Sequence, residues 1–143
     1  MAFGNEAIKG LSQCRRAFKA LPDIAKQAYA DANEDTAEHI RAGAVRRVPV
    51  RYRFLQNAIV MRMNRKTGVA KVGVTNGASV TPDGKTVDPS KYAHFQEFGT
   101  EHHAAHPFMI PATEEQRGPH LQRSRQAGKT IERDMSAIGS RLT

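Results

Sequence analysis

The amino-acid sequence predicts a single α+β domain in which long N-terminal helices pack on a small antiparallel β-hairpin. Three observations predict this class: apolar residues at helical spacing before residue 48, two alternating segments joined by a glycine-containing turn after it, and helical spacing again toward the C-terminus. A chain of 143 residues fits one domain. We divide it into N-terminal helices (1–47), a hairpin region (48–90) with a projecting arm (76–90), and a motif helix followed by a C-terminal helix (91–143).

The N-terminal region is expected to form two helices that are separated at a proline. The first, over residues 5–21, is indicated by apolar residues on one face, Ile8, Leu11, Phe18 and Leu21. Pro22 and Asp23 favour a new first turn, and the second helix then runs to about Arg47. Its narrow, alanine-rich seam is expected to pack closely on a sheet or on a neighbouring subunit. Val48-Pro49-Val50 ends this helix, because the residue before a proline disfavours helical geometry.

The central region is expected to hold two hairpins. Alternating apolar residues predict strands over 58–64 and 69–75, with the turn between them at Asn64-Arg65-Lys66-Thr67-Gly68. The following segment is rich in glycine, proline and threonine, and its Pro82-Asp83-Gly84 triplet is typical of a tight turn. We therefore expect a projecting β-arm over 79–87.

The C-terminal third is expected to contain a short helix and a longer one. Tyr92, Phe95 and Phe98 recur every three residues, which predicts a helix over 92–98 that ends at Gly99. Residues 102–111 are expected to be extended. Pro111 suits the start of the last helix, which Gly118-Pro119 is expected to interrupt.

The charge of the chain is uneven. The formal net charge is +8, and no carboxylate lies between Glu38 and Asp83. The basic residues there are expected to form a contact segment: Arg51, Arg53, Arg62, Arg65, Lys66 and Lys71. Such a face suits nucleic acid or an acidic protein surface, although a solvated basic hairpin explains the same charges. A small basic protein that binds nucleic acid without sequence specificity is therefore one functional reading, and Tyr52 and Phe54 are either stacking residues or core anchors.

The chain carries no recognisable catalytic motif. His94, His102, His103 and His106 lie close together with Glu97 and Glu101, but no HExxH motif is present. The sequence has no GxSxG, GxxxxGK[ST] or GxGxxG motif either. We expect no enzyme, no metal and no cofactor, and a histidine-rich metalloenzyme is the weakest of the three readings.

The sequence also limits the compartment. The single cysteine, Cys14, excludes an internal disulfide framework and a cysteine-based zinc site. No apolar run approaches the roughly 20 residues of a membrane helix, and the N-terminus has no apolar signal core. We expect a protein that is made and assembled in a cytoplasm and has no membrane partner.

Two boxes in the C-terminal half carry a resemblance to a known family. They are Lys91-Tyr92-Ala93-His94-Phe95-Gln96-Glu97-Phe98-Gly99-Thr100 and Ala105-His106-Pro107-Phe108-Met109-Ile110-Pro111-Ala112. Together with the upstream Val48-Pro49-Val50, their order and spacing resemble the tail-component family of long-tailed phages typified by the gene-ten product of HK97. The chain departs from that pattern at Arg51-Tyr52-Arg53-Phe54-Leu55, where the family commonly has a glycine-containing turn.

The resemblance implies a non-enzymatic virion protein of the neck or tail end: a head–tail connector, tail-completion or tail-terminator subunit. Such subunits are similar in forming rings, commonly sixfold, around the DNA channel. Implied partners are further copies of the chain, neighbouring neck and connector proteins, tail-tube proteins, and DNA contacted without sequence specificity. The implied motif or interface residues are Tyr92, Phe95, Glu97, Phe98, Gly99, Thr100, Pro107, Phe108 and Pro111.

Several roles stay open at the level of sequence. Glu97 is a helix cap, a partner for an arginine of the basic segment, or a solvated carboxylate. Phe108, held between two prolines, is a core plug or an interface anchor. Dense cations lining the channel would hinder DNA that slides through it. We therefore expect most of Arg62, Arg65, Lys66 and Lys71 to face protein partners. The 79–87 arm is expected to reach the adjacent ring of the particle.

Overall fold

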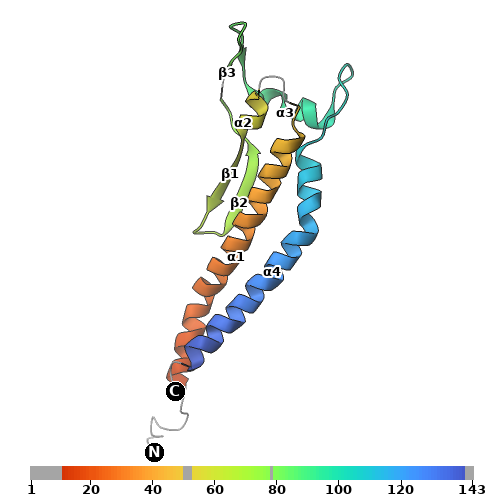
Figure 1. Ribbon diagram of the computed structural model, residues 1–143. Coiled ribbons are helices and arrows are strands. Elements are labelled where there is room, and N and C mark those ends of the chain that lie inside the picture. Colours follow the sequence, from red (N-terminus) through yellow and green to blue (C-terminus); the bar gives the residue numbers. More distant parts are fainter. Residues whose placement is uncertain (1–10, 50–52, 78, 141–143) are drawn as a thin grey trace, which may run out of the picture.

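The computed structural model describes residues 11–49, 53–77 and 79–140. The elements follow one another as α1 (Leu11–Arg47), α2 (Phe54–Ala58), β1 (Ile59–Asn64), β2 (Val69–Val74), β3 (Ser79–Val80), β4 (Thr86–Val87), α3 (Pro89–Phe98) and α4 (Met109–Ser140). Two long helices, α1 and α4, run antiparallel, and the β1–β2 hairpin lies along α1 (Figure 1). The β3–β4 arm and the loop between α3 and α4 project at the opposite end from the two termini (Figure 1). The predicted α+β class is confirmed.

The expected break at Pro22 is wrong, because α1 is continuous from Leu11 to Arg47 with Pro22 inside it. A proline removes the hydrogen bond to the carbonyl four residues earlier. Here the ring is exposed, so water can solvate the freed carbonyl of Phe18. The part of the expected first helix before Leu11 lies outside the described residues.

The expected interruption at Gly118-Pro119 is also wrong, because α4 is continuous from Met109 to Ser140. Both residues are exposed on the outer side of the helix. The helix also begins two residues before Pro111, so the expected extended segment is shorter than predicted.

Small residues bring α1 and α4 close together. Ala30, Ala37 and Ala44, seven residues apart, are buried on one face of α1. Across the seam, a Cβ built on Gly43 would lie 3.3 Å from the Cβ of Ala112. α1 packs on the hairpin, as expected, but its most extensive contact is with α4 of the same chain, which was not expected. Tyr29, predicted to lie on the seam, is instead exposed.

The β1–β2 hairpin forms as predicted, with a register that pairs Ile59 with Val74 and Asn64 with Val69. The Asn64 side chain accepts hydrogen bonds from the N–H groups of Lys66 and Thr67, which fixes the turn. Gly68 completes it with φ 71°. Ala58, predicted to begin the strand, instead ends the short helix α2.

The hydrophobic core lies where the hairpin, α2 and the start of α4 meet the end of α1. Its buried members are Ala44, Val48, Leu55, Ile59, Phe108 and Ala112. None of the helices in the described ranges is long and apolar enough to cross a membrane.

Candidate functional site

The motif end of the molecule comprises the β3–β4 arm, α3, the loop 99–108 and the first turn of α4. Its arm forms as predicted: the N–H of Thr81 donates to Lys85 O at 2.8 Å, and Gly84 turns the chain with φ 76°. Asp88 then caps α3, because its Oδ1 accepts from the Ser90 N–H at 3.0 Å and from the Ser90 hydroxyl at 2.8 Å. The Ser90 side-chain hydrogen bond is the main reason that the pKa of Asp88 is lowered.

Glu97 holds the start of α4. Its carboxylate is 7% exposed and accepts from the N–H groups of Phe108 and Met109 at 2.8 and 2.9 Å, and from that of Ile110 at 2.8 Å. The next residue, Pro111, has no N–H, so one carboxylate satisfies every free donor at this helix start. The negative charge also favours the positive end of the helix dipole. Glu97 is therefore a cap, and neither a solvated carboxylate nor a partner for the basic segment.

Gly99 allows the loop after α3 to fold back closely. Its φ is 75°, and a Cβ there would lie 2.8 Å from the N of Ala105 and 2.9 Å from the O of His103. The loop base is tied by the N–H of His106, which donates to Gln96 O at 2.7 Å, and by a bridge between Thr100 and His103. The predicted need for glycine at this position is confirmed.

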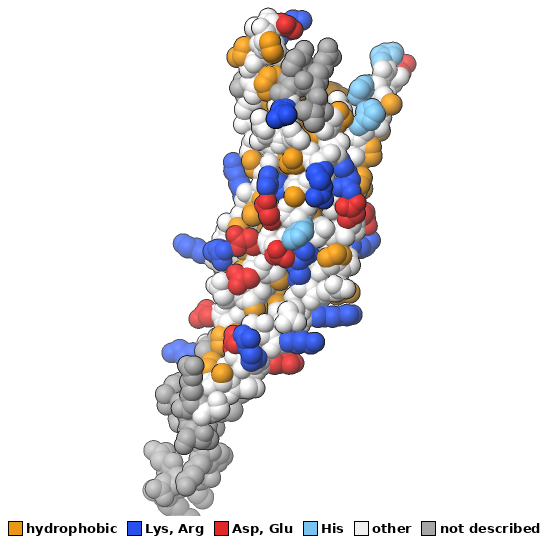
Figure 2. Space-filling model, viewed as in Figure 1, with side chains coloured by type: hydrophobic (Ala, Val, Ile, Leu, Met, Phe, Trp, Pro, Cys, Tyr) orange, Lys and Arg blue, Asp and Glu red, His pale blue; other side chains and the backbone are white. Residues whose placement is uncertain are grey.

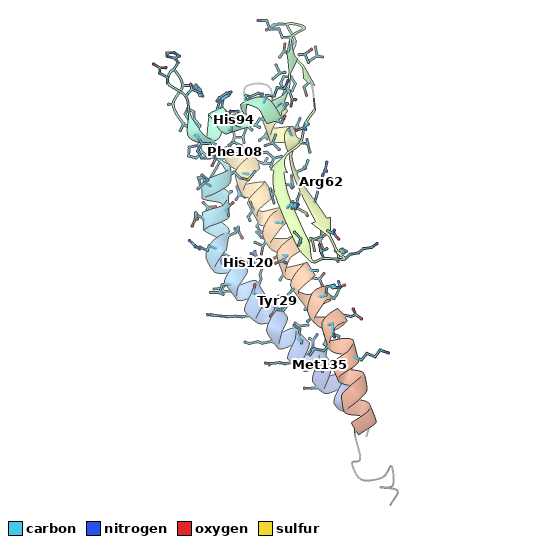
Figure 3. All side chains as sticks on the ribbon, turned by 180° about the vertical axis from the view of Figure 1, so that it is seen from behind. Tyr29, Arg62, His94, Phe108, His120 and Met135 are labelled. Carbon is cyan, nitrogen blue, oxygen red and sulfur yellow. The ribbon has the colours of Figure 1, made fainter. Side chains whose placement is uncertain are left out.

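Histidines gather on the exposed loop (Figure 2). The rings of His103 and His106 lie 5.7 Å apart, and His102 is exposed beside them. In the described ranges, no three His, Cys, Asp or Glu side chains are grouped closely enough to hold a metal ion. The fourth histidine, His94, instead lies on α3 (Figure 3), with its ring 3.8 Å from that of Phe95.

The aromatic residues of the boxes divide into buried and exposed members. Phe108, at 2% exposure, is a core plug, and Tyr92 packs partly buried against the same core. By contrast, Phe95 is 45% exposed and Phe98 is 70% exposed. The three aromatic residues of α3 therefore do not form one buried apolar face. The remaining box residues differ as well, since Thr100 and Pro107 are exposed and Pro111 is half-buried.

The basic segment is not a single surface. Arg65 reaches back to α1, where it pairs with Glu34 and with Asp31 at 3.3 Å. These carboxylates of the same chain neutralise Arg65, and its expected role as a contact for another protein stays a prediction. Arg53 is exposed just before α2 with φ 60°. Arg51, like Tyr52, lies outside the described residues.

Three basic side chains of the hairpin keep their charge free. Arg62 and Lys71 are exposed and lie directly opposite each other in the register, and Lys66 is exposed in the turn. No ion pair joins any of the three to a carboxylate in the described part of the chain. Like charges that face each other across two strands destabilise the pair, so an anion bound at this outer hairpin face would stabilise it.

The acidic face of α1 is already occupied by arginines of the same chain. Besides the pairs of Arg65, Asp35 pairs with Arg123, and Glu38 pairs with Arg41. The hydrogen bond from Arg41 is the main cause that lowers the pKa of Glu38. Figure 2 shows the resulting mixture of both charges over the middle of the molecule.

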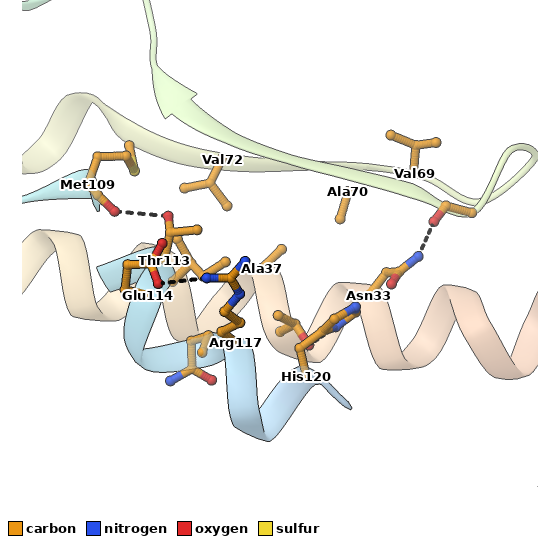
Figure 4. A pocket seen from close by; sticks show the side chains of 14 residues that line it. Asn33, Ala37, Val69, Ala70, Val72, Met109, Thr113, Glu114, Arg117 and His120 are labelled. Atoms are coloured by element: carbon orange, nitrogen blue, oxygen red, sulfur yellow. Dashed lines mark hydrogen bonds and ion pairs between the residues drawn. The ribbon is translucent and has the colours of Figure 1, made fainter. Parts of the chain in front are cut away.

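Two hollows lie at the surface. A groove of about 670 Å³ runs between β2, α1 and α4, with Asn33, Ala37, Val72 and His120 among its lining residues (Figure 4). Its polar side chains have partners: Asn33 donates to Gly68 O at 2.8 Å, and His120 Nδ1 lies 3.1 Å from the hydroxyl of Thr36.

The second hollow, which we call the arm cavity, measures about 430 Å³. It lies among the arm, α2, α3 and the histidine loop, and its main lining residues are Phe54, Leu55, Thr81, Val87, Tyr92 and Gln96. The Gln96 Oε1 atom is buried and, in the part of the chain that the structure describes, has no hydrogen-bond partner. Burial in this region raises the pKa of Tyr92.

Comparison with known families assigns the chain. Residues 12–99 match the family described as "Bacteriophage HK97-gp10, putative tail-component". The chain belongs to this family of phage tail components. No curated protein and no solved structure matches it significantly.

The match to the HK97-gp10-like family ends at Gly99, so it includes the first box except its last residue, Thr100, and none of the second box. The structure brings the two boxes together through Glu97, whose side chain in the first box holds the backbone of Phe108 in the second. Sequence reasoning gave Gln96 no role, although it lies within the first box and lines the arm cavity. It also missed that Asp31 and Glu34 pair with Arg65. The available signal was that these two carboxylates, three residues apart, lie on one face of a helix.

Proposed function

We propose that this HK97-gp10-like chain is a structural subunit of a ring at the phage neck or tail end, which joins the tail to the head around the DNA channel. The family assignment carries the proposal. In this reading the chain acts in the virion by contact alone, without catalysis or a cofactor, after assembly in the host cytoplasm. Sixfold symmetry is the arrangement that we propose for the ring.

The distribution of contacts along the molecule supports this role. The elongated α1–α4 pair forms a stalk, while the arm and the histidine loop project from the motif end (Figure 1). All residues from Thr100 to Pro107 are exposed, as is Val80 on the arm. Projecting segments of this kind suit contacts with neighbouring neck, connector or tail-tube proteins. The arm over 79–87 is our candidate for the segment that contacts the adjacent ring.

A phage that lacks this gene tests the proposal. We expect cells infected with a nonsense mutant to accumulate filled heads and separate tails, visible by electron microscopy, and a plasmid copy of the gene to restore joined particles. Normal joined and infectious particles from the mutant would contradict the proposal.

A second candidate function rests on the unpaired hairpin cations. Arg62, Lys66 and Lys71 carry three positive charges without a carboxylate partner in the described chain. If the hairpin binds nucleic acid, the affinity for any duplex should fall steeply with salt concentration, because each phosphate contact releases counterions. Fluorescence anisotropy with two unrelated duplexes measures this, and salt-independent or absent binding excludes that function.

A further inference from the structure

The wall of the arm cavity contains a hydrogen-bond acceptor that has no donor in the described part of the chain. Its walls include the rings of Phe54 and Tyr92 and the polar side chains of Arg53, His103 and His106. Within the described residues, the buried Gln96 Oε1 atom in this wall has no hydrogen-bond donor. A cavity of about 150 Å³ already accommodates a benzene ring, and this one measures about 430 Å³. Its chemistry therefore suits an aromatic side chain accompanied by an N–H group.

The same chain exposes such a group on α3. Phe98 is 70% exposed, and Ile110, at the start of α4, is 50% exposed. His94 and Lys91 lie about one and two turns before Phe98 on the same side of the helix, and both are exposed. The exposed side of α3 thus presents an aromatic ring flanked by N–H donors.

The exposed ring and the cavity face different directions. Each helical residue advances about 100° around the axis, so Phe98 lies about 200° around α3 from Gln96. Tyr92 and Gln96, which are four residues apart, share the side that lines the cavity. Because the ring and the cavity occupy opposite sides of one rigid helix, a chain cannot fill its own cavity with its own Phe98.

We propose that Phe98 of one copy of the chain inserts into the arm cavity of the next copy, where the donors beside it face Gln96 Oε1. The contact is head-to-tail, and repeated head-to-tail contacts close into a ring when the rotation between copies permits. The inference rests on the proposed ring and names the surface that builds it. It also explains why Phe98 remains outside the core of the isolated chain.

A mixing experiment with two variants tests the contact. Phe98→Asp removes the inserting ring, and Gln96→Trp fills the cavity while it removes the unpaired oxygen. We expect each variant alone to sediment as a monomer in analytical ultracentrifugation. Their equimolar mixture should give a dimer and nothing larger, because one intact ring then meets one intact cavity. Val80→Asp, a matched change of an exposed apolar residue on the arm, should associate as the unaltered chain does.

A photo-crosslink tests the contact in the assembled particle. Benzoylphenylalanine replaces Phe98, and irradiated phage particles are analysed by mass spectrometry. We expect an adduct between two copies of the chain that maps to residues 53–55 or 92–96. An adduct to a different protein, no adduct, or a mixture of variants that stays monomeric while the unaltered chain associates overturns the proposal.

Failure of this contact is distinguishable from failure of the proposed function. If the crosslink maps elsewhere while the nonsense mutant still leaves heads and tails apart, the ring has another interface and the function stands. If the nonsense mutant gives joined particles, the function itself is wrong.

Discussion

At the scale of single residues, the motif end depends on side chains that hold backbone groups in place. The Glu97 carboxylate accepts hydrogen bonds from three N–H groups at the start of α4, and the Asp88 carboxylate caps α3 by accepting from the Ser90 N–H. Gly99 permits a close approach that no other residue allows. These residues shape the loop and the helices, whereas Phe98 and the hairpin cations remain free to meet other molecules.

Replacing Glu97 by alanine should destabilise the protein strongly. The change leaves three N–H groups without an acceptor at a partly buried helix start, and we expect a loss of about 2–4 kcal/mol in the free energy of unfolding. Urea denaturation followed by circular dichroism measures it. Glu101→Ala, at the exposed loop, should change the free energy by less than about 0.5 kcal/mol. Equal effects of the two variants would show that the cap contributes nothing.

Replacing Gly99 by alanine tests whether this position requires glycine. Gly84 is the matched control, because its φ of 76° is nearly the same but no atom lies within 4 Å of a Cβ built there. Gly84→Ala should cost about 1 kcal/mol for its left-handed backbone. Gly99→Ala should cost more, since its Cβ also meets Ala105 and His103, and its ψ of −179° lies in a region that essentially only glycine adopts. Thermal unfolding of both variants tests this, and an equal loss would contradict the contact.

At the scale of elements, local signals were predictable and distant partnerships were not. The turn at Asn64 and the arm at Pro82-Asp83-Gly84 depend on neighbouring residues, so the sequence predicts both. Whether a proline breaks a helix depends on what surrounds it, and the exposed Pro22 and Pro119 both lie within continuous helices. Glu97 lies 11 positions before Phe108, and this separation along the chain gave no means of choosing among its three expected roles.

The cap of α3 should give the protein a pH dependence in the acid range. The hydrogen bond from Ser90 lowers the pKa of Asp88 in the folded state, so the unfolded chain binds the proton more readily. The resulting stability is present above the unfolded pKa of about 3.9 and is lost as the pH falls through the lowered folded value.

The variant Asp88→Asn isolates this dependence, because asparagine also caps helices but does not titrate. We expect the free energies of unfolding of the two proteins to differ by a constant amount from pH 5 to 7. Below pH 4 the unaltered protein should lose stability faster than the variant. Parallel curves down to pH 2 would show that the Asp88 carboxylate has no part in acid unfolding.

At the scale of the whole molecule, some arginines are paired with carboxylates of the same chain, whereas, in the described ranges, the cations of the outer hairpin face are not. Carboxylates of α1 hold Arg65 and Arg123, and Glu115 of α4 holds Arg47. The net charge of +8 therefore leaves cations such as Arg62 and Lys71 exposed without partners in the described residues. Composition predicted a basic surface, but only the fold shows that Arg65 is paired with carboxylates of α1 while Arg62 has no such partner in the described residues.

Reversing both charges of the free pair tests what they contact. Arg62→Glu with Lys71→Glu should change the free energy of unfolding by less than about 0.5 kcal/mol, because both side chains are exposed. In a complementation assay, we expect the double variant to block the joining of heads to tails. The control Arg133→Glu, an exposed change on α4, should join them normally. Normal joining with abnormal DNA retention or ejection by the double variant would place these cations in the channel instead.

The most direct measurement of the central claim is a cryo-electron microscopy reconstruction of the phage neck without imposed symmetry. We predict a closed ring of copies of this chain around the DNA channel where the tail meets the head. Its α1–α4 stalks should repeat around the axis, commonly six times, and the motif end of each copy should touch the next. The chain found as single copies, or in a part of the virion away from the neck and tail end, would contradict the account.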